Sequence, residues 1–161
     1  EKLLGFKAPV IRIMPNINAT VLEAMSAYCC SESVTDDQKE FVNKLCSSFG
    51  KVMPLSESYF PLFCSIAGCA PAYAYMFIDS LARSAVKNGM NKSVALEIAA
   101  QTVLGSAKKI LESDEHPWEL IDKVCSPGGT TIEGIVSLQK DGFESAVCNA
   151  VDAALQKDKK V

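Results

Sequence analysis

The chain has 161 residues, of which 48% are apolar and 22% are charged, and its formal net charge is -3. These values are ordinary for a soluble globular protein that is long enough to bury a hydrophobic core. Nucleic-acid binding has no electrostatic support, because the only basic block is the short tail at residues 157–160.

Cysteine usage bears on metal binding and on the cellular compartment. The sequence has seven cysteines but no C-x-x-C spacing, and its one histidine is His116. A zinc site needs clustered Cys and His ligands, so no metal site is predicted. Most cysteines fall in apolar runs, so we expect reduced core thiols in a cytoplasmic protein. No charged segment precedes an apolar run near residue 1, so we expect no signal peptide. The first residue is Glu1 and not Met, so we expect the chain to be a piece of a longer protein.

The first third of the chain reads as a partial α/β unit. Residues 8–14 are rich in β-branched side chains and predict a strand buried on both faces, and residues 20–30 are a second extended candidate. Thr35 and Gln38 form a capping box at the start of a helix that we expect Gly50 to close. A short strand follows at residues 51–55. We therefore predict a first domain over residues 1–56 with the order strand, strand, helix, strand.

From Glu57 onward the pattern is helical, which predicts a second domain over residues 57–161. Residues 58–78 carry no charge and are long enough to raise the question of a membrane span. Prolines interrupt the run, so we predict two helices rather than a span. Pro71 suits the first position of the second helix, and Gly89 suits its end.

Four further helix starts and one common surface complete the helical part. Asn91 is expected to cap a long helix, His116 to cap a short one that begins at Pro117, and Thr131 to begin a helix that Gly142 ends before a last helix from Phe143. The two helices on either side of Gly89 lack charge over a long face. A chain of this length has few elements to cover that face, so we predict a homo-oligomer interface there.

The stretch CSPGGTTIEG, residues 125–134, lies at the start of one of these helices. The first N–H groups of a helix have no partner within it and suit an anion. Gly128 and Gly129 allow close backbone approach, and Ser126, Thr130 and Thr131 add hydroxyl donors. From the residues alone, a carboxylate or phosphate cradle and a simple helix cap both stay open. No nucleophile with a paired base, and no pair of carboxylates placed for acid–base work, is apparent.

The same region resembles the pyrroline-5-carboxylate reductases. The segment HPWELIDKVCSPGGTTIEGIVSLQKDGF, residues 116–143, is similar to the signature of that family. Residues 99–113 (AAQTVLGSAKKILES) and 68–82 (GCAPAYAYMFIDSLA) resemble the preceding helices, and VIRIMPN, residues 10–16, resembles a late Rossmann strand and its turn. The resemblance covers nearly all of the chain.

The resemblance implies a fold and an activity. The fold would be mainly α: a partial Rossmann tail followed by an all-α dimerisation domain like the C-terminal domain of 6-phosphogluconate dehydrogenase. The family reduces 1-pyrroline-5-carboxylate to L-proline with NADPH or NADH. By position, Ser126, Gly128, Gly129, Thr130 and Thr131 would bind the substrate carboxylate, and Thr131 would also reach the ring nitrogen as the catalytic residue.

The resemblance also implies partners and a cofactor contact. The turn Met14, Pro15 and Asn16 would lie near the nicotinamide. The helical domain would form a homodimer, which can assemble further into a decamer, and neither nucleic acid nor membrane would be a partner.

Two departures from the family pattern matter. The glycine-rich G-x-G-x-x-G turn that holds the cofactor pyrophosphate does not occur in these residues, so weak or no cofactor binding is expected from the chain alone. Cys69 and Ala70 stand where the family commonly has Ser and Gly. Two other functions stay open: a non-catalytic dimerisation or carboxylate-binding module, and a related reductase of another small imino or hydroxy acid.

Overall fold

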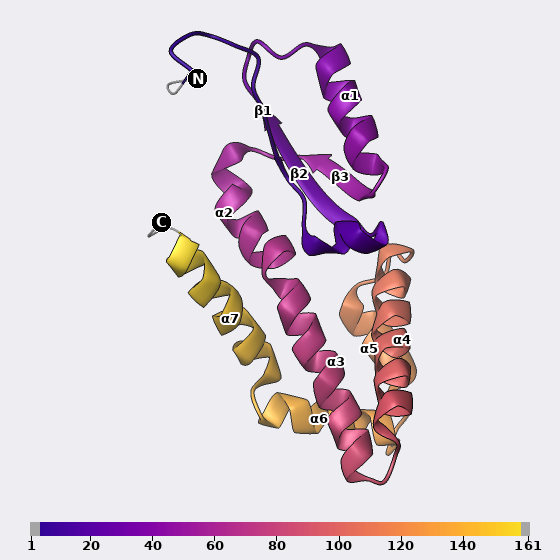
Figure 1. The fold of residues 1–161 in the computed structure, drawn as a ribbon. Helices are drawn as coiled ribbons and strands as arrows, with labels where there is room; N and C mark the ends of the chain where they lie inside the picture. The colour runs from indigo at the N-terminus through magenta and orange to yellow at the C-terminus, as the bar shows by residue number, and fades with distance from the viewer. Residues whose placement is uncertain (1–3, 159–161) are drawn as a thin grey trace. The chain divides into compact units, whose positions relative to one another are not determined.

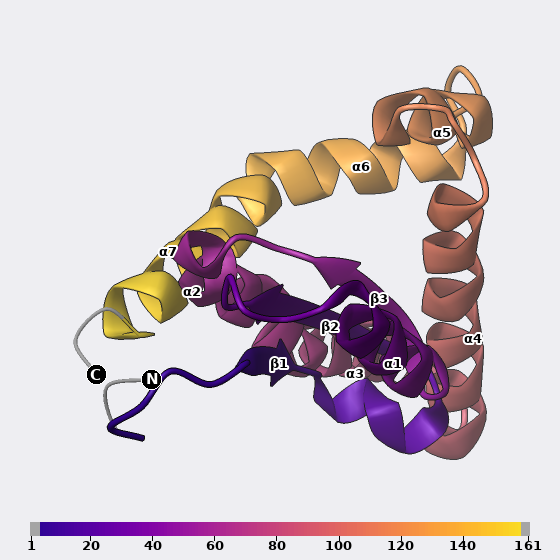
Figure 2. The same ribbon diagram turned by 90° about the horizontal axis from the view of Figure 1, so that it is seen from above.

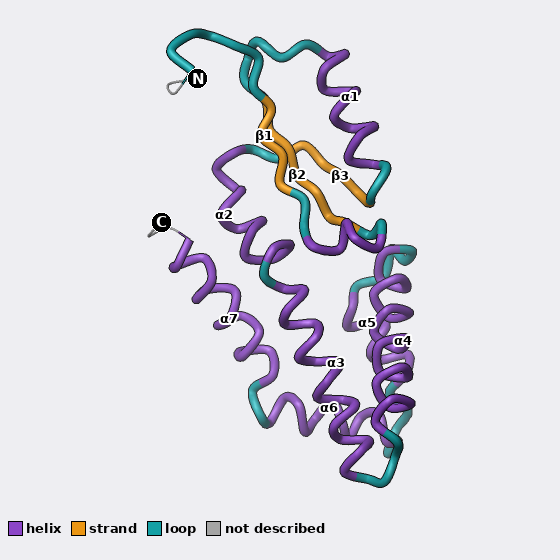
Figure 3. The backbone as a smooth tube through the Cα atoms, in the orientation of Figure 1, coloured by secondary structure: helices purple, strands orange, loops and turns teal. Residues whose placement is uncertain are grey.

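The structure, a computed structural model, describes residues 4–158. Its strands are confined to the first third of the chain, and helices make up most of the rest (Figures 1 and 3). The predicted mainly α fold, with a short α/β segment ahead of the helices, is confirmed. In chain order the strands and α-helices are β1 Ile11–Met14, β2 Ala24–Cys30, α1 Asp36–Ser47, β3 Gly50–Pro54, α2 Phe60–Phe63, α3 Ala70–Lys87, α4 Lys92–Leu111, α5 Pro117–Val124, α6 Thr130–Lys140 and α7 Phe143–Asp158.

The chain divides into two compact units. One combines the chain up to Ala72 with the chain from Ala150, and the other is Tyr73–Asn149. Both α3 and α7 therefore begin in one unit and end in the other. This division does not test the predicted domain boundary after residue 56, which stays a prediction.

The sheet of the first unit has the order β1-β2-β3. β1 pairs with β2 antiparallel, from Ile11 opposite Cys30 to Met14 opposite Ala27, and β2 pairs with β3 parallel. The prediction of a first strand buried on both faces is wrong for this chain, because Arg12 and Ile13 are exposed. Within the described residues β1 is an edge strand, so it has a neighbouring strand on one side only.

Helix α1 lies beside the sheet (Figure 1), and its predicted start is confirmed. The Thr35 hydroxyl accepts a hydrogen bond from the Gln38 N–H at 3.4 Å, and the Gln38 side chain accepts one from the Thr35 N–H at 3.0 Å. This reciprocal pair fixes the first turn. Val42 and Cys46 of α1 then pack with Tyr28 of β2 in the core of the unit.

The predicted role of Gly50 is wrong. Helix α1 already ends at Ser47, with Ser48 as its C-cap, and Gly50 is the first residue of β3. Its φ of +150° and its position opposite Ala24 of β2 bring the two backbones too close for any side chain. A glycine is needed there because β3 approaches β2 closely, and not because a helix ends there.

The helical run from Glu57 to Lys87 spans 31 residues, and a window of mean hydropathy 1.4 within it is apolar enough to cross a membrane by length and composition. A core helix of a soluble protein passes the same test, so this is weak evidence for a membrane span. The predicted second helix is confirmed to within one residue, because α3 starts at Ala70, next to Pro71. Between α2 and α3 the chain forms a π-helical segment, Cys64–Gly68, which was not predicted.

In the second unit, α3 and α4 form a helical hairpin whose contact is built from small residues. Ala82 of α3 packs with Ala95 and Ala99 of α4, and each of the three is at most 5% exposed. The predicted connection is confirmed: Gly89 has a φ of +95°, and the Asn91 side chain accepts a hydrogen bond from the Ser93 N–H at 2.9 Å. Figure 2 shows α5 between the end of α4 and the start of α6.

Large apolar side chains of this hairpin remain exposed. On α3, Met76 is 69% exposed and Tyr75 is 58% exposed, and on α4 the side chains of Leu104 and Leu111 are more than half exposed. Isolated exposed apolar residues are common, but a series along two neighbouring helices is typical of a surface that another chain covers.

Candidate functional site

The predicted substrate-binding residues lie together on the turn that leads into α6. The Gly129 N–H donates to the Ser126 carbonyl at 2.9 Å, which closes the turn, and Gly128 takes a φ of +67°. Gly129 is then the N-cap of α6, and Thr130 and Thr131 are its first two residues. A β-carbon on Gly129 would lie 3.1 Å from the Ser126 carbonyl oxygen and even closer to the Ser126 hydroxyl.

Apart from the Gly129 N–H, which is used within the turn, the donors of this turn are available. No side chain caps α6, and Ser126, Thr130 and Thr131 are all exposed in the single chain. The first N–H groups of a helix lack partners within the helix, and the helix dipole adds partial positive charge there. The arrangement can accept one small anion such as a carboxylate.

Helix α5 fixes the chain just before the turn. The His116 N–H donates to the Glu119 carboxylate at 3.0 Å, and His116 Nδ1 accepts from the Trp118 N–H at 3.2 Å. The predicted capping role of His116 is therefore confirmed. The Lys123 ammonium hydrogen-bonds the Glu115 carboxylate and lowers the pKa of Glu115. Because both ends of this short helix are tied, the turn starts from a defined position.

The predicted cofactor-binding residues belong to the first unit, whereas the turn at Ser126 belongs to the second. Met14 ends β1, Pro15 is exposed, and Asn16 is half-buried at the start of a 3-10 helix, Ile17–Val21. The Asn16 side chain makes two hydrogen bonds within the first unit, to the backbone of Met25 and of Ala67. These two hydrogen bonds were not predicted from the sequence.

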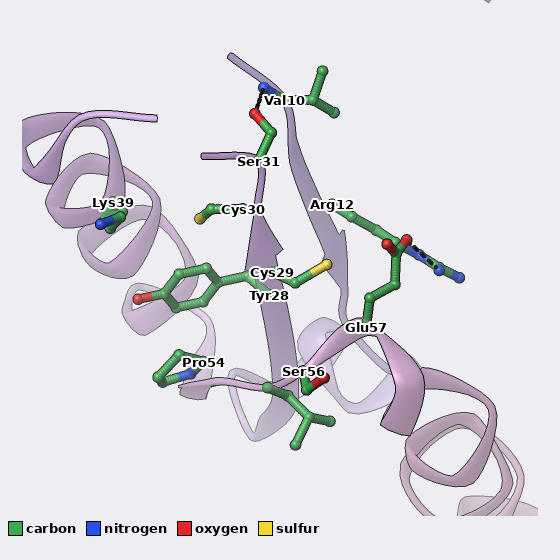
Figure 4. A pocket seen from close by; sticks show the side chains of 11 residues that line it. Val10, Arg12, Tyr28, Cys29, Cys30, Ser31, Lys39, Pro54, Ser56 and Glu57 are labelled. Atoms are coloured by element: carbon green, nitrogen blue, oxygen red, sulfur yellow. Dashed lines mark hydrogen bonds and ion pairs between the residues drawn. The ribbon is translucent and has the colours of Figure 1, made fainter. Parts of the chain in front are cut away.

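An open cavity of about 1130 Å³ lies in the first unit, at the Val10–Cys30 end of the strands and away from Met14. Figure 4 shows Tyr28 and Cys29 leaving β2 on opposite sides and Arg12 reaching Glu57. Arg12 pairs with Glu57 at 3.1 Å and lies 4.6 Å above the Phe60 ring, and Lys39 pairs with Asp36. Both cations that line this cavity are therefore already paired with a carboxylate, in ion pairs that are exposed to solvent.

The cysteines are free thiols, but only Cys46 is buried, whereas Cys148 is exposed and the rest are half-buried. The prediction of core thiols is therefore too broad. Burial raises the pKa of the Cys29, Cys46 and Cys64 thiols, which keeps them protonated and weakens them as nucleophiles. No group of three His, Cys, Asp or Glu side chains in residues 4–158 is placed to hold a metal ion.

Residues 57–161 match the family model for pyrroline-5-carboxylate reductase dimerisation. The chain belongs to the pyrroline-5-carboxylate reductase family. The matched region begins with the residues before α2 and includes the whole turn from Ser126 to Thr131.

Relatives of this family resemble the chain along its entire length. The pyrroline-5-carboxylate reductase of Aquifex aeolicus is 40% identical over 161 residues, which are 100% of this chain and 61% of the relative. That of Escherichia coli is 39% identical over 160 residues, 99% of this chain and 60% of the relative. The chain thus spans about 60% of the length of these curated relatives.

Solved structures of this family are also similar to the chain. The 1-pyrroline-5-carboxylate reductase of Streptococcus pyogenes has a TM-score of 0.90 and 42% identity, over 95% of this chain and 59% of that one. The Plasmodium falciparum pyrroline carboxylate reductase, solved with NADP bound, has a TM-score of 0.92 and 35% identity, over 99% of this chain and 64% of that one.

Proposed function

We propose that the chain is the C-terminal portion of a pyrroline-5-carboxylate reductase, which reduces 1-pyrroline-5-carboxylate to L-proline with NADPH or NADH. The observation that carries this proposal is the family match over residues 57–161, which includes an uncapped helix start suited to a carboxylate. The enzyme would serve proline biosynthesis in the cytoplasm.

The turn before α6 would hold the substrate. The backbone N–H groups of Thr130 and Thr131 and the hydroxyl of Ser126 would bind its carboxylate. Gly128 and Gly129, without side chains, would let the substrate approach the backbone. The Thr131 hydroxyl would donate a hydrogen bond to the ring nitrogen as the imine is reduced. These residues bind and orient, and their contribution to the rate comes from placing the reacting carbon and stabilising the nitrogen.

The hydride comes from the nicotinamide cofactor when it is bound. Of this chain, the turn Met14, Pro15 and Asn16 would lie near that cofactor. No G-x-G-x-x-G occurs in the 161 residues, so the chain alone lacks the motif that holds a dinucleotide pyrophosphate. Calorimetry on the chain alone should detect little NADPH binding, and micromolar affinity would contradict this part of the proposal.

A second copy of the chain would cover the exposed faces of α3 and α4. The chain should therefore elute as a dimer or larger in size-exclusion chromatography with light scattering. Support comes from the dimerisation family and from apolar side chains such as Met76 and Leu104, which are more than half exposed. Elution as a monomer over a wide range of protein concentrations would contradict the interface, whereas a mass of ten chains would identify a decamer.

The decisive experiment is an assay of the full-length protein with 1-pyrroline-5-carboxylate and each nicotinamide cofactor, followed by cofactor oxidation. Fast turnover of this substrate supports the proposal. Faster turnover of another small imino or hydroxy acid would favour the related-reductase reading. No turnover of any of them, together with proline binding in calorimetry, would favour a non-catalytic carboxylate-binding module.

Gly129→Ala should raise the KM for the imino acid about fivefold in the full-length enzyme. The added β-carbon would displace the Ser126 hydroxyl, and a lost hydrogen bond of about 1 kcal/mol corresponds to a change of that size. Steady-state kinetics measure this effect. Gly134→Ala is the matched control, because a β-carbon there meets nothing within 4 Å, and equal effects of the two changes would contradict the assignment.

A further inference from the structure

The side chain of Asn16 joins two segments that are far apart in sequence. Its Oδ1 accepts a hydrogen bond from the Met25 N–H at 3.1 Å, and its Nδ2 donates to the Ala67 carbonyl at 3.0 Å. Asn16 is half-buried and Ala67 is only 8% exposed. Both bonds are partly shielded from water, so each is stronger than a fully exposed hydrogen bond.

The local structure gives Asn16 a simpler alternative that it does not use. It occupies the N-cap of the 3-10 helix Ile17–Val21, where an asparagine side chain usually accepts from a following N–H. No such cap bond is present. The carboxamide is directed instead to the strand that follows and to the helical run 50 residues later, so tertiary contacts decide its orientation.

The Ala67 carbonyl has a specific need for this donor. In an α-helix it would accept from the N–H of residue 71, but residue 71 is proline and has none. The chain here forms the π-helical segment Cys64–Gly68, closed by a 3.0 Å bond from the Cys69 N–H to the Cys64 carbonyl. Asn16 therefore supplies a donor at the place where Pro71 withholds one.

We propose that Asn16 is a positioning residue, whose carboxamide locks the turn after β1 against the π-helical segment and so holds Met14 and Pro15 in their working shape. The bridge itself rests on the contacts above. Its effect on catalysis rests on the proposed function, in which this turn meets the cofactor. π-helical segments are often found at functional sites, in agreement with a role beyond packing.

The test is a mutant cycle in the full-length protein. Asn16→Asp keeps the acceptor for Met25 but loses the donor to Ala67, and Asn16→Leu loses both. Each should raise the KM for NADPH about fivefold with kcat changed less than twofold, the effect of losing one or two hydrogen bonds that position a binding segment. Thr20→Val, which removes only a local 3.0 Å bond to the Ile17 carbonyl, should leave both constants unchanged.

Pro71→Ala provides the discriminating background, because it gives residue 71 an N–H that can satisfy the Ala67 carbonyl. In that background Asn16→Asp should raise the KM less than twofold. An equal rise in both backgrounds would overturn the proposal and make Asn16 a direct ligand. An unchanged KM in the Asn16→Leu variant would overturn it as well.

Amide hydrogen exchange separates the bridge from the reductase function. The Met25 amide should lose protection in the Asn16→Leu variant and keep it in the Asn16→Asp variant. Full protection in both variants would refute the bridge whatever the activity. If the wild-type protein reduces no imino acid, the proposed function fails, and a Met25 amide that follows this pattern would leave the bridge standing as a purely structural feature.

Discussion

Gly50→Ala is expected to lower the free energy of unfolding by about 3 kcal/mol or more, because the added β-carbon would overlap the backbone of Ala24. A β-carbon at this position would lie 2.7 Å from the Ala24 Cα and closer still to other Ala24 backbone atoms. Ala24 is 3% exposed at the start of the central strand β2, so it cannot move aside. The φ of +150° adds backbone strain for any residue with a side chain. Urea unfolding of the wild-type protein and the Gly50→Ala variant, at equal protein concentration, measures this change in the free energy of unfolding.

Gly89→Ala is the matched control for this prediction. Gly89 also has a positive φ, of +95°, but a β-carbon there meets no atom within 4 Å. The change should lower the free energy of unfolding by only about 1 kcal/mol, the cost of a side chain on a backbone with positive φ. Equal losses at the two glycines would show that the close approach of β2 and β3 is not the source of the large effect.

Thr131→Val in the full-length enzyme should lower kcat/KM about tenfold or more. Valine has nearly the shape of threonine but cannot donate to the nitrogen, and a hydrogen bond to a charged group is worth about 1.5–3 kcal/mol. Thr131 lies in the first turn of α6 and is exposed, so the change should leave the stability of the fold nearly intact. Steady-state kinetics with 1-pyrroline-5-carboxylate measure the effect, and unchanged kinetics would remove Thr131 from the site.

Thr130→Val separates the hydroxyl of Thr131 from a general effect on the helix start. Thr130 precedes Thr131 in α6 and is equally exposed. Its proposed contribution comes from its backbone N–H, which valine retains. The Thr130→Val enzyme should therefore keep kcat/KM within about threefold of the wild-type value, since the valine change removes no backbone hydrogen bond. A tenfold loss in both variants would point to a disturbed helix start.

The elements whose ends are set by local chemistry were predictable. Thr35 with Gln38, Asn91, His116 with Pro117, and Gly142 mark helix ends that the structure places within one or two residues. Each signal depends on hydrogen bonds or dihedral angles within a few residues, so it can be seen without the fold. The predicted anion site in the turn before α6 rests on a local pattern of the same kind.

The misjudged features depend on contacts between distant segments. Gly50 looked like a helix end, because a glycine after an apolar helical pattern usually is one, but it serves the approach of β3 to β2. Pro71 marked the start of α3 to within one residue, but the sequence did not predict the π-helical segment Cys64–Gly68 or the hydrogen bond from Asn16 to the Ala67 carbonyl. In both cases the distant partner, Ala24 or Asn16, lies tens of residues away.

By itself, the sequence determined the mainly α fold, the capped helix ends and the family, and it predicted five residues of the turn from Ser126 to Thr131 as a carboxylate site. Periodicity, caps and motif spacing carry that information, because each is a relation between near neighbours along the chain. Only the tertiary structure decided that β1 is an edge strand, that Gly50 is required by strand packing, and that the Asn16 carboxamide satisfies the Ala67 carbonyl. These three features depend on packing or hydrogen bonds between segments that are distant in the sequence. A local sequence pattern therefore cannot predict them.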